Sequence, residues 1–269
     1  MDDSSGPRLP PILAHKDHRA ASAFQVENLL REGRRQRGLP DGVVPRLCVL
    51  DPDGDLLRHL VAEGRTGPSP TWACYHTTLH VFEHEGTSFG IVGCAVGSSF
   101  AVLVAEEMFA SGCELLVSIT SSGQLQSLGP TPYFVLIDRA LRDEGTSYHY
   151  LPPSDYAAAD PALADRAFDA ALGGGVRAHR GAVWTTDAPF RETAAAITAM
   201  TERGLLAVEM ESAALYAFAQ ARGRAVICFA YVTNTMAQTD QGDFEKGAHN
   251  GAHEALRLLA AIARTTPAR

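Results

Sequence analysis

Ala207-Val-Glu-Met-Glu-Ser-Ala-Ala-Leu215 and, shortly after it, Ala225-Val-Ile-Cys-Phe-Ala-Tyr-Val232 are the two segments that decide the fold. The first predicts a short apolar strand that leads into an alanine-rich helix over residues 212–221, which Gly223 would end as a C-cap. The second is the most apolar run of the chain and predicts a buried strand. A strand, a helix and another buried strand in this order is typical of an α/β fold.

The same alternation continues in both directions along the chain. It predicts an α/β domain of three layers over residues 46–269, with a central, mixed or largely parallel sheet flanked by helices. Residues 1–45 read as an N-terminal extension with a helical pattern over 20–37, which we expect to pack on the main body or on a neighbouring subunit. The strands are expected at 46–50, 78–83, 89–94, 114–118, 133–137, 181–184, 205–208 and 225–232, and the helices at 100–110, 161–172, 191–203, 212–221 and 252–263.

Composition excludes several classes of protein. The 269 residues include 31 acidic and 23 basic side chains, and this net charge of −8 argues against binding to a nucleic-acid backbone. No apolar run approaches the roughly 18 to 20 residues that cross a membrane. The five cysteines are scattered without a CxxC pair, which favours reduced thiols over disulfides or a zinc site. The first residues lack the layout of a signal peptide. We therefore expect a cytoplasmic protein with no metal.

Small and polar residues follow four of the expected strands. Ligands of α/β proteins collect at the carboxyl ends of the strands. Gly97 and Ser98 lie between a strand and a helix, where backbone amides and the helix dipole suit an anion. Residues 118–123 (Ser-Ile-Thr-Ser-Ser-Gly) supply hydroxyl groups for a phosphate, a sugar or a base. Both segments are also compatible with ordinary turns that bind nothing.

The other two strand ends carry a carboxylate pair and an amide. Glu209 and Glu211 flank Met210, and a buried carboxylate at such a place needs a partner, which two ribose hydroxyls would supply. Acidic residues at a helix start also suit the helix dipole without any ligand. Asn234 both donates and accepts, which suits the edge of a nucleobase, although asparagine is also a common turn residue.

Taken together, these segments resemble the nucleoside phosphorylase superfamily, and most closely its uridine phosphorylase branch, over about residues 46–264. Residues 51–53 (Asp-Pro-Asp) and 185–190 (Thr-Thr-Asp-Ala-Pro-Phe) add to the resemblance. It implies cleavage of the N-glycosidic bond of a small-molecule nucleoside through a cation-like transition state. It also implies no metal, no organic cofactor, phosphate as a co-substrate and a homo-oligomer, either a dimer or a hexamer.

The resemblance also assigns roles to individual residues. Glu211 and Asn234 would be catalytic. The ribose would be held by Glu209, Met210 and Glu211, the base by Ser122, Gly123, Phe190 and Asn234, and the phosphate or another acceptor would face Gly97, Ser98 and Ser121.

Three arginines that hold phosphate in that family are absent from the matching positions. The family's Gly-Asp-Pro-x-Arg turn reads Leu50-Asp-Pro-Asp-Gly54 here, Ser118 occupies the second position, and Tyr75 and His76 lie near the third. Each charge-assisted contact to an anion contributes about 1.5 to 3 kcal/mol, so phosphate affinity should fall steeply. Protonated histidines at positions 76, 80 and 84 would replace part of the missing positive charge. The alternative is that they are ordinary surface residues without this role.

The base pocket departs from the family as well, because the pyrimidine-reading insertion is not evident after Phe190 and Asn234 replaces the purine branch's aspartate. Four hypotheses follow. The first is phosphorolysis to base and ribose 1-phosphate, and the second is hydrolysis, which needs no cationic cradle. The third is nucleoside binding without turnover. The fourth is a generic α/β scaffold with an unrelated ligand at Gly97 and Ser98.

Overall fold

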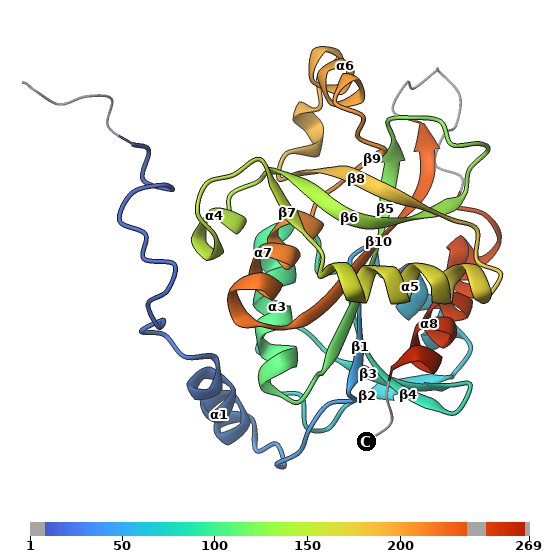
Figure 1. Ribbon diagram of the computed structural model, residues 1–269. Coiled ribbons are helices and arrows are strands. Elements are labelled where there is room, and N and C mark those ends of the chain that lie inside the picture. Colours follow the sequence, from blue (N-terminus) through green and yellow to red (C-terminus); the bar gives the residue numbers. More distant parts are fainter. Residues whose placement is uncertain (1–8, 236–245, 267–269) are drawn as a thin grey trace, which may run out of the picture.

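The chain folds around one mixed β-sheet with helices on both faces, which confirms the fold predicted from the sequence (Figure 1). The computed structural model describes residues 9–235 and 246–266. Within them the strands are β1 (Leu47–Asp51), β2 (Thr66–Pro68), β3 (His80–His84), β4 (Thr87–Gly93), β5 (Leu115–Gln124), β6 (Tyr133–Asp143), β7 (Tyr156–Ala158), β8 (Ala178–Thr186), β9 (Ala207–Glu209) and β10 (Ala225–Thr235).

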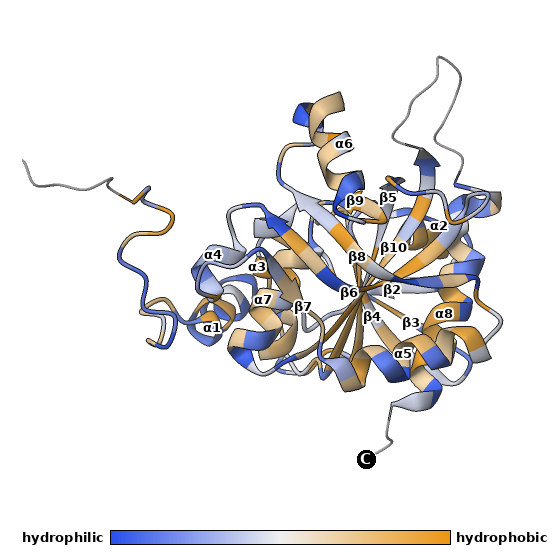
Figure 2. Cartoon of the chain, turned by 45° about the horizontal axis from the view of Figure 1, so that its top comes forward, coloured by the Kyte–Doolittle hydropathy of each residue, from blue (hydrophilic) through white to orange (hydrophobic). Residues whose placement is uncertain are grey.

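Most of the helices lie in two groups. The helices are α1 (Val26–Arg37), α2 (Asp55–Ala62), α3 (Ser98–Ala110), α4 (Ser147–Tyr150), α5 (Pro161–Gly173), α6 (Ala194–Glu202), α7 (Ser212–Arg222) and α8 (Ala252–Thr265), and the short 3₁₀ turns are η1 (Pro189–Arg191) and η2 (Ala248–Gly251). One group contains α3, α4 and α7, and the other contains α2, α5 and α8. Apolar residues gather on the central strands between them (Figure 2).

Part of the sheet closes into a ring. The strand order is β10-β6-β8-β9-β5-β1-β4-β3-β2, and β10 also pairs with β5. Strands β5, β9, β8, β6 and β10 therefore form a closed circuit of hydrogen-bonded neighbours. Parallel pairing of β1 with β5 and of β5 with β10 brings their carboxyl ends to one edge. That edge is where the expected site residues meet.

Strand β5 runs further than the apolar pattern predicts. β5 was expected to end at Ser118, but it continues through the hydroxyl residues because β10 pairs with Ser121 and Ser122. β9 pairs with Gly123 on the same strand. The small polar residues therefore belong to a rigid strand and not to a loop.

Other differences are local. The helix expected over 191–203 is divided into η1 and α6, because the Thr193 side chain accepts from the Ala196 N–H and starts a new helix there. The sequence analysis did not predict α2, α4, β2 or β7. Helix α1 begins later than expected and packs on residues 71–75, where Arg37 donates to the Cys74 carbonyl at 2.7 Å and Tyr75 donates to Gln36 at 2.9 Å.

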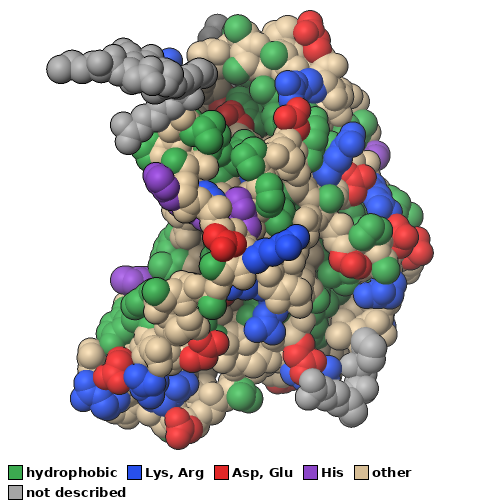
Figure 3. Space-filling model, turned by 60° about the vertical axis from the view of Figure 1, so that its left-hand side comes forward, with side chains coloured by type: hydrophobic (Ala, Val, Ile, Leu, Met, Phe, Trp, Pro, Cys, Tyr) green, Lys and Arg blue, Asp and Glu red, His purple; other side chains and the backbone are tan. Residues whose placement is uncertain are grey.

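On the side of the molecule that Figure 3 shows, acidic and basic side chains are interspersed. This side therefore carries no large patch of one charge. No helix in the described residues is long and apolar enough to span a membrane.

Candidate functional site

The turn after β1 forms one wall of the site. Asp51 ends the strand, its carbonyl accepts from the N–H groups of Gly54 and Cys94, and its buried carboxylate accepts from the Leu57 N–H at 2.9 Å. Gly54 has a φ of +75°, and a Cβ at this position would lie 2.6 Å from the Cys94 sulfur. Only glycine fits here without strain or a clash, so an arginine at this position, to which the resemblance matches one of the phosphate arginines, would face both penalties.

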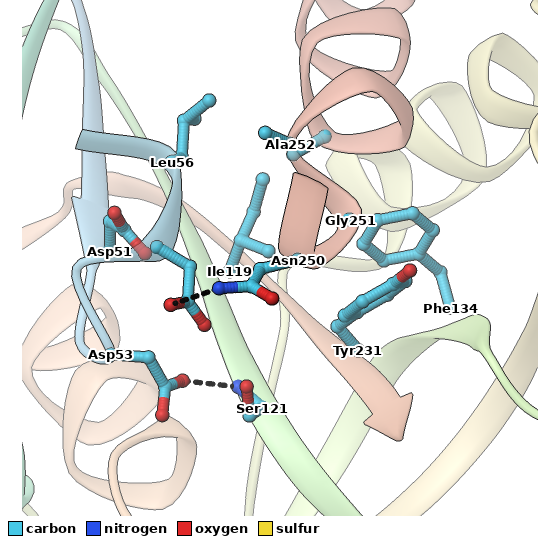
Figure 4. Close-up of a pocket in the computed structure, with 12 residues that line it drawn as sticks. Asp51, Asp53, Leu56, Ile119, Ser121, Phe134, Tyr231, Asn250, Gly251 and Ala252 are labelled. Carbon is cyan, nitrogen blue, oxygen red and sulfur yellow. Dashed lines mark hydrogen bonds between the residues drawn. The ribbon is translucent and has the colours of Figure 1, made fainter. Parts of the chain in front are cut away.

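Asp53 links this turn to β5. Its Oδ2 accepts a 2.7 Å hydrogen bond from the backbone N–H of Ser121 (Figure 4). A backbone amide of this kind is a donor that a bound anion would otherwise use. The Asp53 carboxylate therefore already accepts from the Ser121 N–H, one of the donors that we expected to face the acceptor.

The charges around the turn do not favour a dianion. Arg58 donates to Asp55 and to the Asp53 carbonyl, both at 2.7 Å, and Lys246 pairs with Asp55 and lies 3.6 Å from Asp53. Burial, and next the charges of Asp53 and Asp55, raise the pKa of Asp51 to about 7, although its hydrogen bond from Leu57 opposes this. Three carboxyl groups thus face two cations within the described residues.

A small cavity lies behind the turn. Its volume is about 20 Å³, which is room for a single water molecule. Figure 4 shows Asp51, Asp53 and Ser121 on one side of it and Tyr231 and Phe134 on the other. Asn250 and Gly251 from η2 also line it.

Glu211 lies at the meeting point of three elements. It is 1% exposed, and its two carboxylate oxygens accept from the Gly97 N–H at 2.7 Å and from the Thr120 hydroxyl at 3.0 Å. Gly97 has a φ of +90°, so a glycine is required to aim that amide. Burial, followed by the Glu209 charge, raises the pKa of Glu211, and the two hydrogen bonds lower it.

Glu209 has a different set of partners. Its Oε2 accepts from the N–H groups of Glu211 and Ser212 and from the Ser212 hydroxyl, each at 2.8 Å, and its Oε1 accepts from Thr185. These contacts satisfy the N-terminal amides of α7. The two carboxylates of the motif therefore bind the N-terminal ends of two different helices. Glu209 accepts from the start of α7, and Glu211 accepts from Gly97, which directly precedes α3.

The remaining predicted residues are distributed as follows. Ser98 is buried and donates to the Met210 carbonyl at 2.8 Å, so it ties α3 to the carboxylate motif. Met210 itself is partly exposed. Ser122 is buried and donates to the Thr120 carbonyl at 3.3 Å. Gly123 lies opposite Asn234, next to a bulge of β10.

Phe190 is not brought to the rest of the set. It lies in η1 and its exposed fraction is 99%, so nothing in the described residues covers it. Ser118, which stands where the family has an arginine, is buried, and its hydroxyl has no hydrogen-bond partner within the described residues.

Comparison with known proteins decides the family. The family model described as "Phosphorylase superfamily" matches residues 46–264. The chain belongs to the phosphorylase superfamily. Among curated relatives, a guanosine phosphorylase of Halorubrum lacusprofundi is 27% identical over 52% of this chain and 58% of its own length. A DeoD-type purine nucleoside phosphorylase of Bacillus cereus is 28% identical over 56% of this chain and 66% of its own length. The chain thus spans about three fifths of the relatives that it matches.

Solved structures of the superfamily share the fold. A uridine phosphorylase of Vibrio fischeri gives a TM-score of 0.69 at 20% identity, with 83% of this chain and 93% of that chain covered. A purine nucleoside phosphorylase of Toxoplasma gondii gives 0.69 at 16% identity, covering 91% and 98%. A 5′-methylthioadenosine/S-adenosyl homocysteine nucleosidase of Campylobacter jejuni gives 0.68 at 14% identity, covering 82% and 100%.

Within this superfamily member, the structure adds residues that the sequence analysis did not assign to the site. Asp53, Thr120 and Lys246 hold or border the expected acceptor and sugar positions. Asp53 is the third residue of the Asp51-Pro-Asp53 segment, and the resemblance of this segment to the family is the one sequence signal for Asp53. Thr120 lies beside Ser121 on β5, but nothing in the sequence distinguishes it from the neighbouring hydroxyl residues.

Proposed function

We propose that this chain cleaves the N-glycosidic bond of a ribonucleoside and transfers the sugar to water. The observation that carries the choice of acceptor is the hydrogen bond from the Ser121 N–H to Asp53. A phosphate dianion would have to displace this carboxylate and lie among Asp51, Asp53 and Asp55. A neutral water molecule carries no such electrostatic cost, and the adjoining cavity has the volume of one.

Glu211 is the residue that we assign to the sugar. Ribose hydroxyls can donate to its carboxylate, which the Gly97 amide and the Thr120 hydroxyl hold in place. Positive charge that develops on the sugar as the bond breaks favours the ionised form of a carboxyl group whose pKa burial has raised. The attraction therefore grows from the ground state to the transition state, which is the condition for catalysis.

Asp53 is the group that we assign to the acceptor. Its Oδ2 is fixed by Ser121, whereas Oδ1 lies 3.6 Å from the Lys246 ammonium group. A carboxylate that borders a water-sized cavity can accept the proton that the attacking water loses. Asn234, opposite Gly123 on β5, is assigned to the departing base, to which its amide can donate.

His80 does not supply one of the family's missing cations. Burial lowers the pKa of His80, so this imidazole is neutral at physiological pH. Arg58 and Lys246 are engaged with Asp55. Phosphorolysis remains the second candidate because the curated relatives are phosphorylases.

One assay separates the two reactions. The protein is incubated with a panel of purine and pyrimidine ribonucleosides in buffers with and without inorganic phosphate, and free base and free ribose are measured. Hydrolysis predicts equal release of base in both buffers and ribose as the product. Release that requires phosphate, with ribose 1-phosphate as the product, would show that the acceptor is phosphate. Binding of nucleoside without any release would overturn catalysis altogether.

We also propose a homo-oligomer, as expected from the resemblance. Size-exclusion chromatography with light scattering measures its mass. A dimer or hexamer agrees with this proposal, and a monomer at assay concentration contradicts it.

A further inference from the structure

Three imidazoles and a carboxylate gather where α2 meets α8, away from Glu211. The ligand atoms of His59, Glu63 and His253 all lie within 4.8 Å of one another. His249, on η2, packs its ring against His253 with the centroids 4.5 Å apart. His59 and Glu63 are four residues apart and so share one face of α2 and its C-terminal cap.

The rings have the spacing of ligands around one ion. The ring centroid of His59 lies 5.4 Å from that of His249 and 5.2 Å from that of His253. Imidazoles bound tetrahedrally at a metal–nitrogen distance of about 2.1 Å have centroids about 5 Å apart. The ring spacing of His59, His249 and His253 is thus compatible with three nitrogen ligands of one ion.

One ring nitrogen of the group lacks a hydrogen bond. Nε2 of His59 is buried without a hydrogen-bond partner in the described residues, and a carboxylate oxygen of Glu63 lies 3.4 Å from it. Glu63 also accepts from Arg65 at 3.0 Å. A buried nitrogen atom without a partner is costly in a folded protein, and a bound metal ion would satisfy it.

The backbone around His249 is also unusual. His249 and Asn250 both have positive φ values, 52° and 51°, in a region that residues other than glycine rarely adopt. Strain of this kind persists where surrounding contacts require it. Here it places the centroid of the His249 ring 5.4 Å from that of His59 and 4.5 Å from that of His253.

We propose that His59, Glu63, His249 and His253 bind one divalent transition-metal ion, with Zn²⁺ the best match. Neutral imidazole suits Zn²⁺ and its neighbours, whereas Mg²⁺ and Ca²⁺ require oxygen ligands. One carboxylate and three histidines complete a tetrahedral set. The sequence analysis expected no metal, because the ligands come from two segments far apart in the chain and follow none of the usual cysteine patterns.

The ion would have a positioning role and no contact with substrate. Asn250 and Gly251 of η2 line the water-sized cavity, and Asn250 donates to Asp55 at 3.3 Å. Lys246, just before η2, pairs with the same aspartate. A metal that joins α2 to η2 and α8 would therefore hold one wall of that cavity.

The test uses the full chain without an affinity tag, freed of metal by a chelator and titrated with Co²⁺, whose visible absorption reports tetrahedral coordination. We expect saturation at one Co²⁺ per chain, displacement by Zn²⁺ and a higher Tm with Zn²⁺ than with chelator. Substoichiometric binding with no absorption band would overturn the proposal.

Two variants locate the ion. His253→Ala and Glu63→Gln both alter exposed side chains, and each should weaken Co²⁺ binding by more than the roughly 10- to 100-fold that loss of an outer partner causes. His84→Ala, an exchange of a histidine on β3 outside the group, is the matched control and should bind Co²⁺ like the wild type. Circular dichroism of the metal-free variants checks folding. Unchanged affinity in both variants would place the ion elsewhere and contradict the proposed ligand set.

Discussion

The carboxylate of Asp53 accepts the backbone N–H of Ser121 at 2.7 Å, so a turn after the first strand is tied to a strand 68 residues further along the chain. This contact places a negative charge at the position expected for the acceptor. This charge is the reason that we propose water, and not phosphate, as the acceptor.

Replacing Asp53 tests its role in activating water. Asp53→Asn retains an oxygen that can accept from Ser121 but cannot take a proton, so base release should fall by about 10²- to 10⁴-fold while Tm changes little. Steady-state release of base and thermal unfolding are the measurements. Asp41→Asn, at a fully exposed side chain, is the control. A variant with wild-type rates would show that Asp53 is not the base.

Glu209 should contribute mainly to the stability of the fold, and Glu211 mainly to nucleoside binding and turnover. Glu209→Gln disturbs a carboxylate oxygen that accepts three hydrogen bonds at the start of α7, and should lower the free energy of unfolding by about 1 to 3 kcal/mol. Glu211→Gln exchanges one of two accepting oxygens for an amide nitrogen but also removes a charge from a buried position, so it should lose less stability than Glu209→Gln and should lose nucleoside affinity and turnover. Urea unfolding and calorimetric binding measure both. The assignment fails if the two variants exchange these phenotypes.

Asp51 should make stability depend on pH. Its pKa is raised from an ordinary value of 3.8 to about 7 in the folded chain. The folded state therefore holds this proton more tightly than the unfolded state, and the resulting stabilisation is lost as pH rises from about 4 to about 7. The largest loss is about 4 kcal/mol.

Asp51→Asn isolates this effect, because an amide keeps an acceptor for Leu57 and has no charge. The variant should match the wild type near pH 4 and exceed its stability at pH 8, as measured by urea unfolding across this range. A difference between the two proteins that does not vary with pH would contradict the raised pKa.

Gly54 should tolerate no side chain. Gly54→Ala combines a positive φ with a Cβ that lies 2.6 Å from the Cys94 sulfur, and should destabilise the fold by about 2 to 4 kcal/mol. Gly38→Ala has a similar φ of +62° and open space, so it should cost only about 1 to 2 kcal/mol. Thermal unfolding compares them. Equal losses would mean that the cysteine moves aside freely.

The sequence predicted the layers of the fold and most of its strands because apolar runs separated by helical patterns report burial directly. It did not predict α2, which begins right after a turn with a proline and a glycine, or the length of β5, which only pairing with β10 and β9 explains. The strand before the carboxylate motif and the helix after it were both predicted. The division between Glu209 and Glu211 was not predictable, because it depends on Gly97, Thr120 and Thr185, which lie far away in sequence.

The closed circuit of β5, β9, β8, β6 and β10 has a consequence for how such a site can change over time. A strand held on both sides cannot slide or tilt without breaking two sets of backbone hydrogen bonds, so Thr120, Ser121 and Asn234 keep their mutual positions. New specificity must then arise in segments outside the circuit, such as the 51–54 turn and η1. The 51–54 turn, with its aspartates at positions 51 and 53, lies outside the circuit and can change while the strands stay in place.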